Sequence, residues 1–589
     1  MTLDLELMKD LHLKGNAAFD GTMYDNKDFY PQVTEQMRQR NYAELTQRYE
    51  RRYSFVGEAY LSYAKKWADR HNLNAMAGFS VQKDKGEYMT ATKQEFADES
   101  EDQLVMDNGA TMRAINGNYY TESALASFYG RVFYSLNDRY LVTVTFRADG
   151  SSKFAPGKRW GYFPAFSFGW RLSQESFMRD IDFIDDLKLI GGWGLLGNQD
   201  VADLQYLTIM ARNTNYGNIY TFGNEQVGGS HITSLANPNI TWEKTGMTNV
   251  GIDGTFFNQQ LTASVTWFNK KTVDMLVPTV ALGTLGQATI PDSNIGEMLN
   301  RGWEIEAGFH QNLQSGFYYD LSMNLSFVKN KVLKLYGNNN FISSVYYGRQ
   351  NQEISRTYEG DPIASFYGWK TDGLYQNMEE IANDPNIAND PRKANITPGD
   401  VRFVDMNNDG VIDEGDRTYL GDPNPNTTLG FQAKFGYKGF DLSMNFIGSF
   451  GAELYNADRM QGLDPSYSYN MYAETLNRWH GEGTSNSIPK MSTLRTNMNH
   501  RTSDLFIENG DYFKLKTMTL GYTFPKKWTD PINIHSLRLF VTAENLFTIT
   551  SYSGYSPEIG YTDGNKQRGV DYAQYPMSRK FTFGLKVNF

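Results

Sequence analysis

The sequence of 589 residues contains no cysteine, which excludes disulfide bridges and cysteine-ligated metal sites. It has no basic excess either, because 56 Lys and Arg against 67 Asp and Glu give a formal net charge of −11. This balance argues against a general nucleic-acid binder, since no surplus of cations exists to neutralise phosphates. No apolar run approaches the roughly 18 residues that a membrane-spanning helix requires. The N-terminal stretch MTLDLELMKDLHLKG also lacks the basic and then apolar pattern of a secretory signal peptide.

Aromatic residues and period-two alternation are abundant instead. Aromatics make up 14% of the chain, with 38 Tyr and 37 Phe. In FYYDLSMNLSF (317–327) every second residue is apolar, and the last nine residues, FTFGLKVNF, repeat this pattern and end on Phe589. Successive side chains of a strand point to opposite faces, so each such strand has one apolar and one polar face. Nothing else in the chain covers these apolar faces. We therefore predict an all-β fold, a transmembrane antiparallel β-barrel whose outer face contacts lipid.

The connections between the predicted strands alternate between short and long, as they do in outer-membrane barrels with short periplasmic turns and long extracellular loops. The count from the last strand backwards gives about sixteen strands, the first rising from a turn near residue 10. The predicted short connections are 137–138, 257–260, 312–316, 437–439 and 525–536. The predicted long connections are 93–118, 197–238, 273–296, 332–426, 453–509 and 550–576.

Four stretches are specific enough to suggest a family. They are GRVFYSLNDRYLVTVTFRADGSSKFAPGKRWGYFPAFSFGWRLSQESFM (130–178), LKLIGGWGLLGNQ (187–199), NGDYFKLKTMTLGYTFP (509–525) and LRLFVTAENLFTITSYSGYSPEI (537–559). Together with the terminal Phe, they resemble the barrel of SusC/RagA-type TonB-dependent transporters, and the resemblance spans essentially the whole chain. It implies a 22-stranded barrel, an N-terminal plug with a TonB box, and a SusD-like surface lipoprotein as a lid over the extracellular mouth. It also implies import of oligosaccharides or, in some members, peptides, with energy relayed through TonB–ExbB–ExbD.

The chain departs from that pattern because the signal peptide, the plug domain and about six leading strands are absent from residues 1–589. About sixteen strands of an expected 22 would leave two open edges in lipid, where unpaired backbone groups are costly. We therefore expect the chain to be the C-terminal barrel part of a longer outer-membrane importer, through a truncated gene sequence or a partial chain. A passive sixteen-stranded porin and a secreted β-rich glycan-binding protein or glycosidase are the alternatives.

The segment DMNNDGVIDEGD (405–416) has the spacing of an EF-hand-type calcium loop within the long connection 332–426. Calcium binds six to eight oxygen ligands around a sharp turn, and Gly410 stands at the sixth position, where that turn is needed. Positions 1, 3, 5, 7, 9 and 12 are Asp405, Asn407, Asp409, Val411, Asp413 and Asp416. We predict that they hold Ca²⁺, Val411 through its carbonyl, and that the ion braces the loop without performing chemistry. The alternative is an Asx-rich turn without an ion.

No other motif indicates catalysis, so we predict that the protein is not an enzyme. GWGLLG (192–197) satisfies G-x-G-x-x-G but lacks the βαβ context of a dinucleotide site. The seven histidines have no H-x-x-x-H spacing. The aromatic segments 344–350 and 464–474 are candidates to stack on sugar rings or to pack against a lid protein, and no single substrate-binding residue is predicted. Four arginines are predicted to line the lumen: Arg139, Arg147, Arg171 and Arg538.

Overall fold

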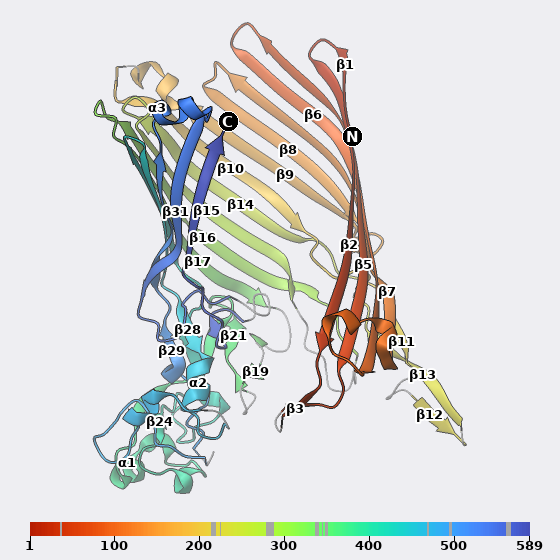
Figure 1. Ribbon diagram of the computed structural model, residues 1–589, viewed down its shortest axis with the longest axis vertical. Helices are drawn as coiled ribbons and strands as arrows, with labels where there is room; N and C mark the ends of the chain where they lie inside the picture. The colour runs from red at the N-terminus through yellow and green to blue at the C-terminus, as the bar shows by residue number, and fades with distance from the viewer. Residues whose placement is uncertain are drawn as a thin grey trace. The chain divides into compact units, whose positions relative to one another are not determined.

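The structure of the chain is a computed structural model in which strands contain most of the residues in regular elements (Figure 1). Among the described residues, no helix is both long enough and apolar enough to cross a membrane. The structure describes residues 1–35, 38–178, 180–213, 219–223, 225–277, 288–335, 341–343, 346–347, 352–467, 470–493, 497–560 and 567–589.

Among the described residues, the main sheet contains 17 strands, and the all-β prediction is confirmed. The sequence predicted about sixteen. The first observed strand was not predicted. It lies before the turn near residue 10, whereas the first predicted strand began after that turn. The strands are β1 (Thr2–Met8), β2 (Leu11–Tyr30), β5 (Glu44–Trp67), β6 (His71–Phe96), β7 (Gly109–Leu136), β8 (Tyr140–Ser151), β9 (Trp160–Arg171), β10 (Ile184–Asn198), β14 (Glu243–Phe256), β15 (Leu261–Val277), β16 (Ser293–Asn312), β17 (Tyr318–Leu335), β26 (Thr427–Tyr437), β27 (Phe440–Phe450), β30 (Tyr512–Thr523), β31 (Ser536–Thr550) and β33 (Lys580–Asn588).

The chain divides into two compact units, and five strands of the main sheet (β9, β10, β14, β15 and β16) contribute residues to both. Unit 1 contains Met1–Trp170, Gly192–Met247 and Thr272–Asn294. Unit 2 contains Arg171–Gly191, Thr248–Lys271 and Ile295–Phe589.

In unit 1 each strand pairs antiparallel with the next, in the order β1–β2–β5–β6–β7–β8–β9. Three of these strands are long, with 24 residues in β5, 26 in β6 and 28 in β7, and Figure 1 shows them side by side. The predicted turn at 137–138 joins β7 to β8. Asn137 and Asp138 both have left-handed backbone angles, φ 55° and 52°, and the Arg139 amide donates to the Leu136 carbonyl at 3.0 Å, as in a type I′ turn. Arg139 also belongs to this connection, because β7 ends at Leu136 and β8 begins at Tyr140.

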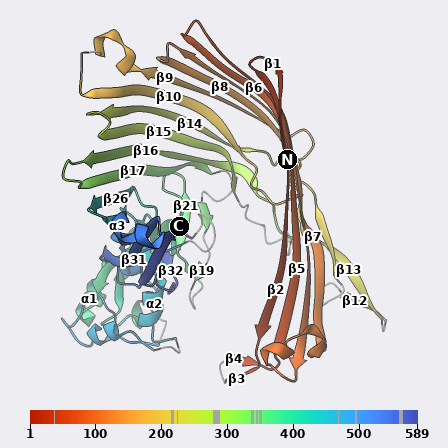
Figure 2. The same ribbon diagram turned by 45° about the horizontal axis from the view of Figure 1, so that its top comes forward.

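In unit 2 the order is β16–β17–β26–β27–β30–β31–β33, again antiparallel at every step. Figure 2 shows β16 and β17 running side by side. The alternation predicted for the last strand is present. In the pairing of β33 with β31, Phe583 lies opposite Val541 and Leu585 opposite Leu539, so these apolar side chains share one face. Phe583 is 78% exposed and Leu585 61% exposed, which is the arrangement of a sheet face that contacts lipid.

In unit 1, aromatic side chains lie at both ends of the outward face of the sheet. Trp170 stacks on Tyr140 at one end of β9, with 6.5 Å between ring centroids, and Trp160 stacks on Phe128 at the other, at 6.0 Å. The two tryptophans lie on one strand ten positions apart, which is about 33 Å along the strand at 3.3 Å per residue. With the tilt of about 40° usual for such barrels, the separation along the membrane normal is about 25 Å, the height of an outer-membrane apolar band.

The predicted loop 332–426 contains packed structure with its own core. It includes β22 (Ser365–Trp369), β24 (Val401–Phe403), β25 (Arg417–Gly421) and helix α1 (Met378–Asn383). A cluster of buried side chains fills it: Trp369, Leu374, Tyr375, Ile381, Ile387, Ile396, Val401, Phe403 and Ile412.

A second connection, which includes α2 (Ala457–Leu463), is tied to this core by hydrogen bonds. The Trp369 amide donates to the carbonyl of Thr502 at 2.9 Å. The Leu374 amide donates to Asn486 Oδ1 at 2.9 Å, and the Val401 amide to Asn499 Oδ1 at 3.0 Å. The two connections therefore form one packed body at the strand ends opposite the short turns.

Candidate functional site

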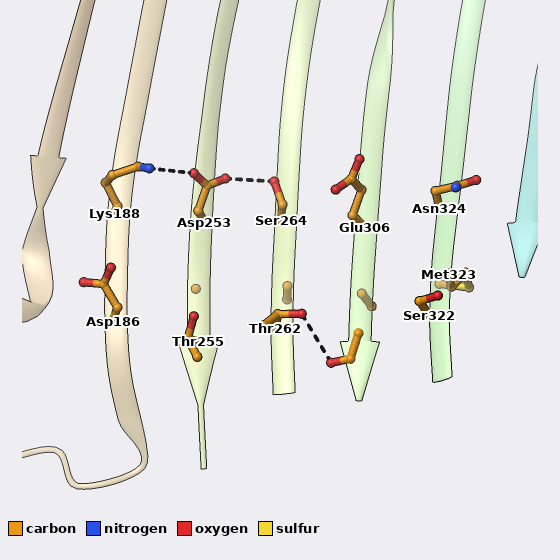
Figure 3. A pocket seen from close by; sticks show the side chains of 14 residues that line it. Asp186, Lys188, Asp253, Thr255, Thr262, Ser264, Glu306, Ser322, Met323 and Asn324 are labelled. Carbon is orange, nitrogen blue, oxygen red and sulfur yellow. Dashed lines mark hydrogen bonds and ion pairs between the residues drawn. The ribbon is translucent and has the colours of Figure 1, made fainter. Parts of the chain in front are cut away.

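A polar groove of about 540 Å³ lies on the inward face of unit 2, near the short turns. Figure 3 shows its side chains on five neighbouring strands, β10, β14, β15, β16 and β17. At its centre Asp253 accepts a hydrogen bond from Ser264 Oγ at 2.9 Å and pairs with Lys188 Nζ at 3.1 Å. Asp186 accepts from Ser173 Oγ at 2.5 Å, and Glu306 adds a further carboxylate. The groove is thus a polar part of the wall in which carboxylates outnumber cations.

A second pocket, of about 630 Å³, lies at the opposite ends of β16 and β17. We call it the amide pocket, because four asparagines line it together with apolar side chains and three charged ones. Its lining residues are Met298, Asn300, Val328, Lys329, Asn330, Pro362, Ile363, Asp422, Asn424, Pro425, Asn426 and Arg568.

Hydrogen bonds hold the amides of this pocket in fixed orientations. Asn330 Nδ2 donates to Asn300 Oδ1 at 2.7 Å, while Asn330 Oδ1 accepts from the Ile363 amide at 2.8 Å. Arg568 donates to Asn424 Oδ1 at 3.0 Å. Burial raises the pKa of the Asp422 carboxyl above its ordinary value, although the amide and side chain of Asn424 act in the other direction. Fixed donors and acceptors beside apolar surface are suited to a neutral, polyhydroxylated or amide-bearing ligand.

The segment 405–416 folds as a series of tight turns around its own acidic side chains. Asp405 Oδ1 accepts from the Asn408 amide at 2.7 Å, and Asp405 Oδ2 accepts from the Gly410 amide at 2.6 Å. Gly410 has φ 81°, the left-handed conformation that the sixth position was predicted to need. Asn407 and Asp409 likewise accept from the amides two residues further along the chain.

The far end of the same segment is buried. Asp416 accepts from the amides of Met406 and Asp413, at 2.9 and 2.7 Å, and so joins the two ends of the loop. Burial raises the pKa of Asp416, and the charge of Asp405 acts in the same direction. Across the described part of the chain, no three or more His, Asp or Glu side chains are arranged to hold a metal ion. The predicted ligands thus lie in one series of tight turns. Side-chain oxygens of Asp405, Asn407, Asp409 and Asp416 accept hydrogen bonds from backbone amides.

The predicted wall arginines contact carboxylates and aromatic rings. Arg147 Nε donates to Asp149 Oδ1 at 2.8 Å, and Arg538 Nε donates to Asp441 Oδ1 at 3.0 Å. Arg171 lies 3.4 Å from Asp186. The fourth, Arg139, is in the turn after β7, where its guanidinium lies over the Tyr140 ring at 6.0 Å. These contacts describe a wall of paired charges.

The glycines of GWGLLG serve packing in β10. A Cβ at Gly197 would lie 2.1 Å from the Phe163 ring, and a Cβ at Gly194 would lie 2.9 Å from Ala165 Cβ, so side chains at these positions would collide with β9. Of the aromatic segments, 344–345, 348–350 and 468–469 lie outside the described residues. Tyr346–Tyr347 forms the short strand β19 and pairs with β20 (Gln352–Glu353).

Sequence reasoning missed both pockets. Each combines inward positions from several strands, and the alternation of polar residues marks those positions without giving the register that brings them together. The amide pocket joins residues as far apart as Met298 and Arg568.

Comparison with known proteins places the chain among membrane receptors. The family model described as TonB dependent receptor-like, beta-barrel, matches residues 2–546. TonB-dependent receptor P3 of Formosa agariphila is 31% identical over 556 residues, which are 93% of this chain and 53% of that protein. TonB-dependent receptor SusC of Bacteroides thetaiotaomicron is 31% identical over 478 residues, 80% of this chain and 44% of that protein.

Among solved structures, that of the RagAB peptide transporter superposes with a TM-score of 0.83 at 21% identity, covering 100% of this chain and 61% of the matched chain. At this identity the likeness shows the fold alone. The chain spans about half the length of the curated relatives it matches.

Proposed function

The chain belongs to the TonB-dependent receptor β-barrel family, and from this premise we propose that it forms the wall and outer mouth of an importer driven by TonB. The family is one of outer-membrane receptors and transporters rather than enzymes, so the chain is an outer-membrane protein, and the predicted resemblance to SusC and RagA is confirmed. Membership of this family argues against a passive porin and a secreted glycan-binding protein.

The observation that carries the proposal is the difference between the two faces of the main sheet. The outward face carries large exposed apolar side chains, such as Phe583 in β33 and Val81 in β6. The inward face carries charge pairs such as Lys188 with Asp253 and Arg538 with Asp441. A sheet with lipid on one side and water on the other is the wall of a transport barrel. In this arrangement the long connections face the cell exterior and the short turns the periplasm.

We infer that the cargo is an oligosaccharide. The amide pocket supports this choice, because it offers oriented amides beside small apolar surfaces such as Met298 and Ile363. Sugars require many hydrogen-bonding groups and a flat apolar contact, and no full charge of one sign. A peptide is the alternative, and the solved peptide transporter with the same fold gives it weight. We also propose that a SusD-like lipoprotein covers the packed connections, and that TonB–ExbB–ExbD supplies the energy.

Equilibrium binding of oligosaccharides and of peptides to the purified protein separates these cargoes. Asn300→Leu with Asn330→Leu removes two oriented amides and should weaken sugar binding about thirtyfold, since each lost hydrogen bond costs about 1 kcal/mol. Asn324→Leu, on the inward face near the opposite ends of the strands, is the matched control. Peptide binding that the double variant weakens, with no saccharide binding by the parent, would show that the cargo is a peptide.

We further propose that residues 405–416 hold Ca²⁺ through the six predicted ligands. Two observations support this: Gly410 has the left-handed conformation of a sharp turn, and Asp405 lies close enough to Asp416 for its charge to act on that carboxyl. On binding, the carboxylates of Asp405, Asp409 and Asp413 would turn from backbone amides to the ion. Its role would be to brace the connection, and isothermal titration of the protein with Ca²⁺, with Mg²⁺ as control, measures the binding.

A further inference from the structure

The outward face of unit 1 contains a second type of cavity, an apolar groove of about 530 Å³. A row of paired positions across five strands supplies its floor and part of its walls: Gly57 pairs with Val81, Val81 with Ala126, Ala126 with Gly150, and Gly150 with Trp160. Paired residues of an antiparallel sheet point to the same side, so all five belong to the lipid-facing surface. Three of the five are Gly or Ala, which makes the row a depression.

Large side chains form the walls of this depression. Phe55 is 60% exposed and Val81 50% exposed, so both stand out from the sheet beside the small residues. The Trp160 indole lies over Gly150, where a Cβ would be only 2.9 Å from the ring, and it stacks on Phe128. Small residues thus leave a channel between aromatic and aliphatic walls that suits a chain of methylene groups.

Two cations stand at the mouth of the groove. Lys83 pairs with Phe55 and Ala124, one row further from the short turns than Val81. Its ammonium lies 3.2 Å from Glu122, and both side chains are about three-fifths exposed, so this ion pair is weak and exchangeable. Arg159, also exposed, lines the same groove and donates from Nε to the Phe154 carbonyl at 3.3 Å.

The height of these cations matches a lipid headgroup. Trp160 belongs to the aromatic belt at the end of the strands that carry the long connections, about 25 Å from the belt at Trp170. Aromatic belts lie at the level of the headgroups, with hydrocarbon between them. Lys83 and Arg159 are therefore at headgroup level, and the floor from Gly57 to Gly150 lies on the hydrocarbon side.

We propose that this groove binds lipid A of the outer leaflet, with one acyl chain along the floor and a phosphate between Lys83 and Arg159. The choice of lipid A rests on the proposed orientation, which puts this belt in the leaflet facing the exterior. The groove volume lies within the range of roughly 300–1,000 Å³ usual for small-molecule sites. Bound lipid would brace β5–β9 from outside, without contact with the cargo path.

Native mass spectrometry of the protein, extracted in mild detergent from outer membranes, tests the proposal. The parent should retain lipid A, and titration with purified lipid A in phosphatidylcholine nanodiscs should saturate. Lys83→Gln with Arg159→Gln should weaken binding about thirtyfold, because each cation near an anionic headgroup contributes about fivefold. Ala126→Trp, which fills the floor, should abolish it.

Matched controls make the same charge and volume changes outside the groove. Lys9→Gln with Lys65→Gln removes two cations near the short turns, and Ala75→Trp adds the same indole lower on β6; both should bind lipid A as the parent does. Equal binding by parent and groove variants would overturn the proposal, as would retention of glycerophospholipid without lipid A. Cargo binding measured on the same samples reports separately on the importer function.

Discussion

The last strand offers a direct test that lipid, and no protein layer, covers the outward face. Asn588 is the last residue of β33 and pairs with Ser536, next to the short turn before β31, and Phe583 lies five positions before it. Five residues span about 17 Å along a strand, or about 13 Å along the membrane normal at a tilt of about 40°. In an apolar band about 25 Å high, this places Phe583 near the middle of the bilayer.

Phe583→Arg should therefore lower the free energy of unfolding by about 2–4 kcal/mol, the cost of a lipid-facing arginine at the bilayer midplane. Thr582→Arg places the same charge one residue away on the inward, hydrated face, and its cost should be near zero. Urea unfolding in phospholipid vesicles, followed by tryptophan fluorescence and heat-modifiable gel migration, measures both. The proposed function depends on lipid contacting the outward face of the sheet and water contacting the inward face. Equal costs for the two variants, or a larger cost for Thr582→Arg, would refute this interpretation.

Three further predictions concern the connections and the strand packing. In limited proteolysis, Asp405→Ala with Asp409→Ala should lose the chelator-sensitive protection of the 332–426 connection; identical cleavage of parent and variant with and without chelator would contradict the calcium proposal. Gly197→Val should destabilise the barrel by about 1–3 kcal/mol through collision with the Phe163 ring, and in thermal melting its cost should be smaller in a Phe163→Ala background than in the parent. Because burial raises the pKa of Asp422, its folded form binds a proton more readily than its unfolded form, so the connection should gain stability as pH falls through the folded pKa, a gain complete only below the unfolded value of about 3.8. Hydrogen exchange against pH should show this gain in the parent and its loss in Asp422→Asn.

The wall of the barrel was readable from the sequence because its pattern is local. Alternation along 581–589 fixed the two faces of β33, and Asn137-Asp138 fixed a hairpin, since both signals lie within a few residues. The signature stretches supplied the family, which composition alone does not reveal.

The parts that depend on register or on irregular packing were not readable. Asn300 and Asn330 meet only because β16 and β17 pair in one register, and Arg568 reaches Asn424 across a separation of 144 residues. The core around Trp369 was expected to be a loop, since its apolar residues follow neither a strand nor a helix period. The calcium hypothesis stays a prediction. The spacing of these residues shows which side-chain oxygens are available as ligands, but it does not give the orientation of those side chains.

The hydrogen bonds that tie the 352–421 segment to the 453–506 segment have a consequence for engineering and for evolution. Trp369, Leu374 and Val401 on one segment take their partners from Thr502, Asn486 and Asn499 on the other. If either segment alone were transplanted into a related barrel, its donors or acceptors in these three hydrogen bonds would lose their partners. Cargo preference should therefore be inherited as a matched pair of segments, and chimaeras should work only when both are exchanged together.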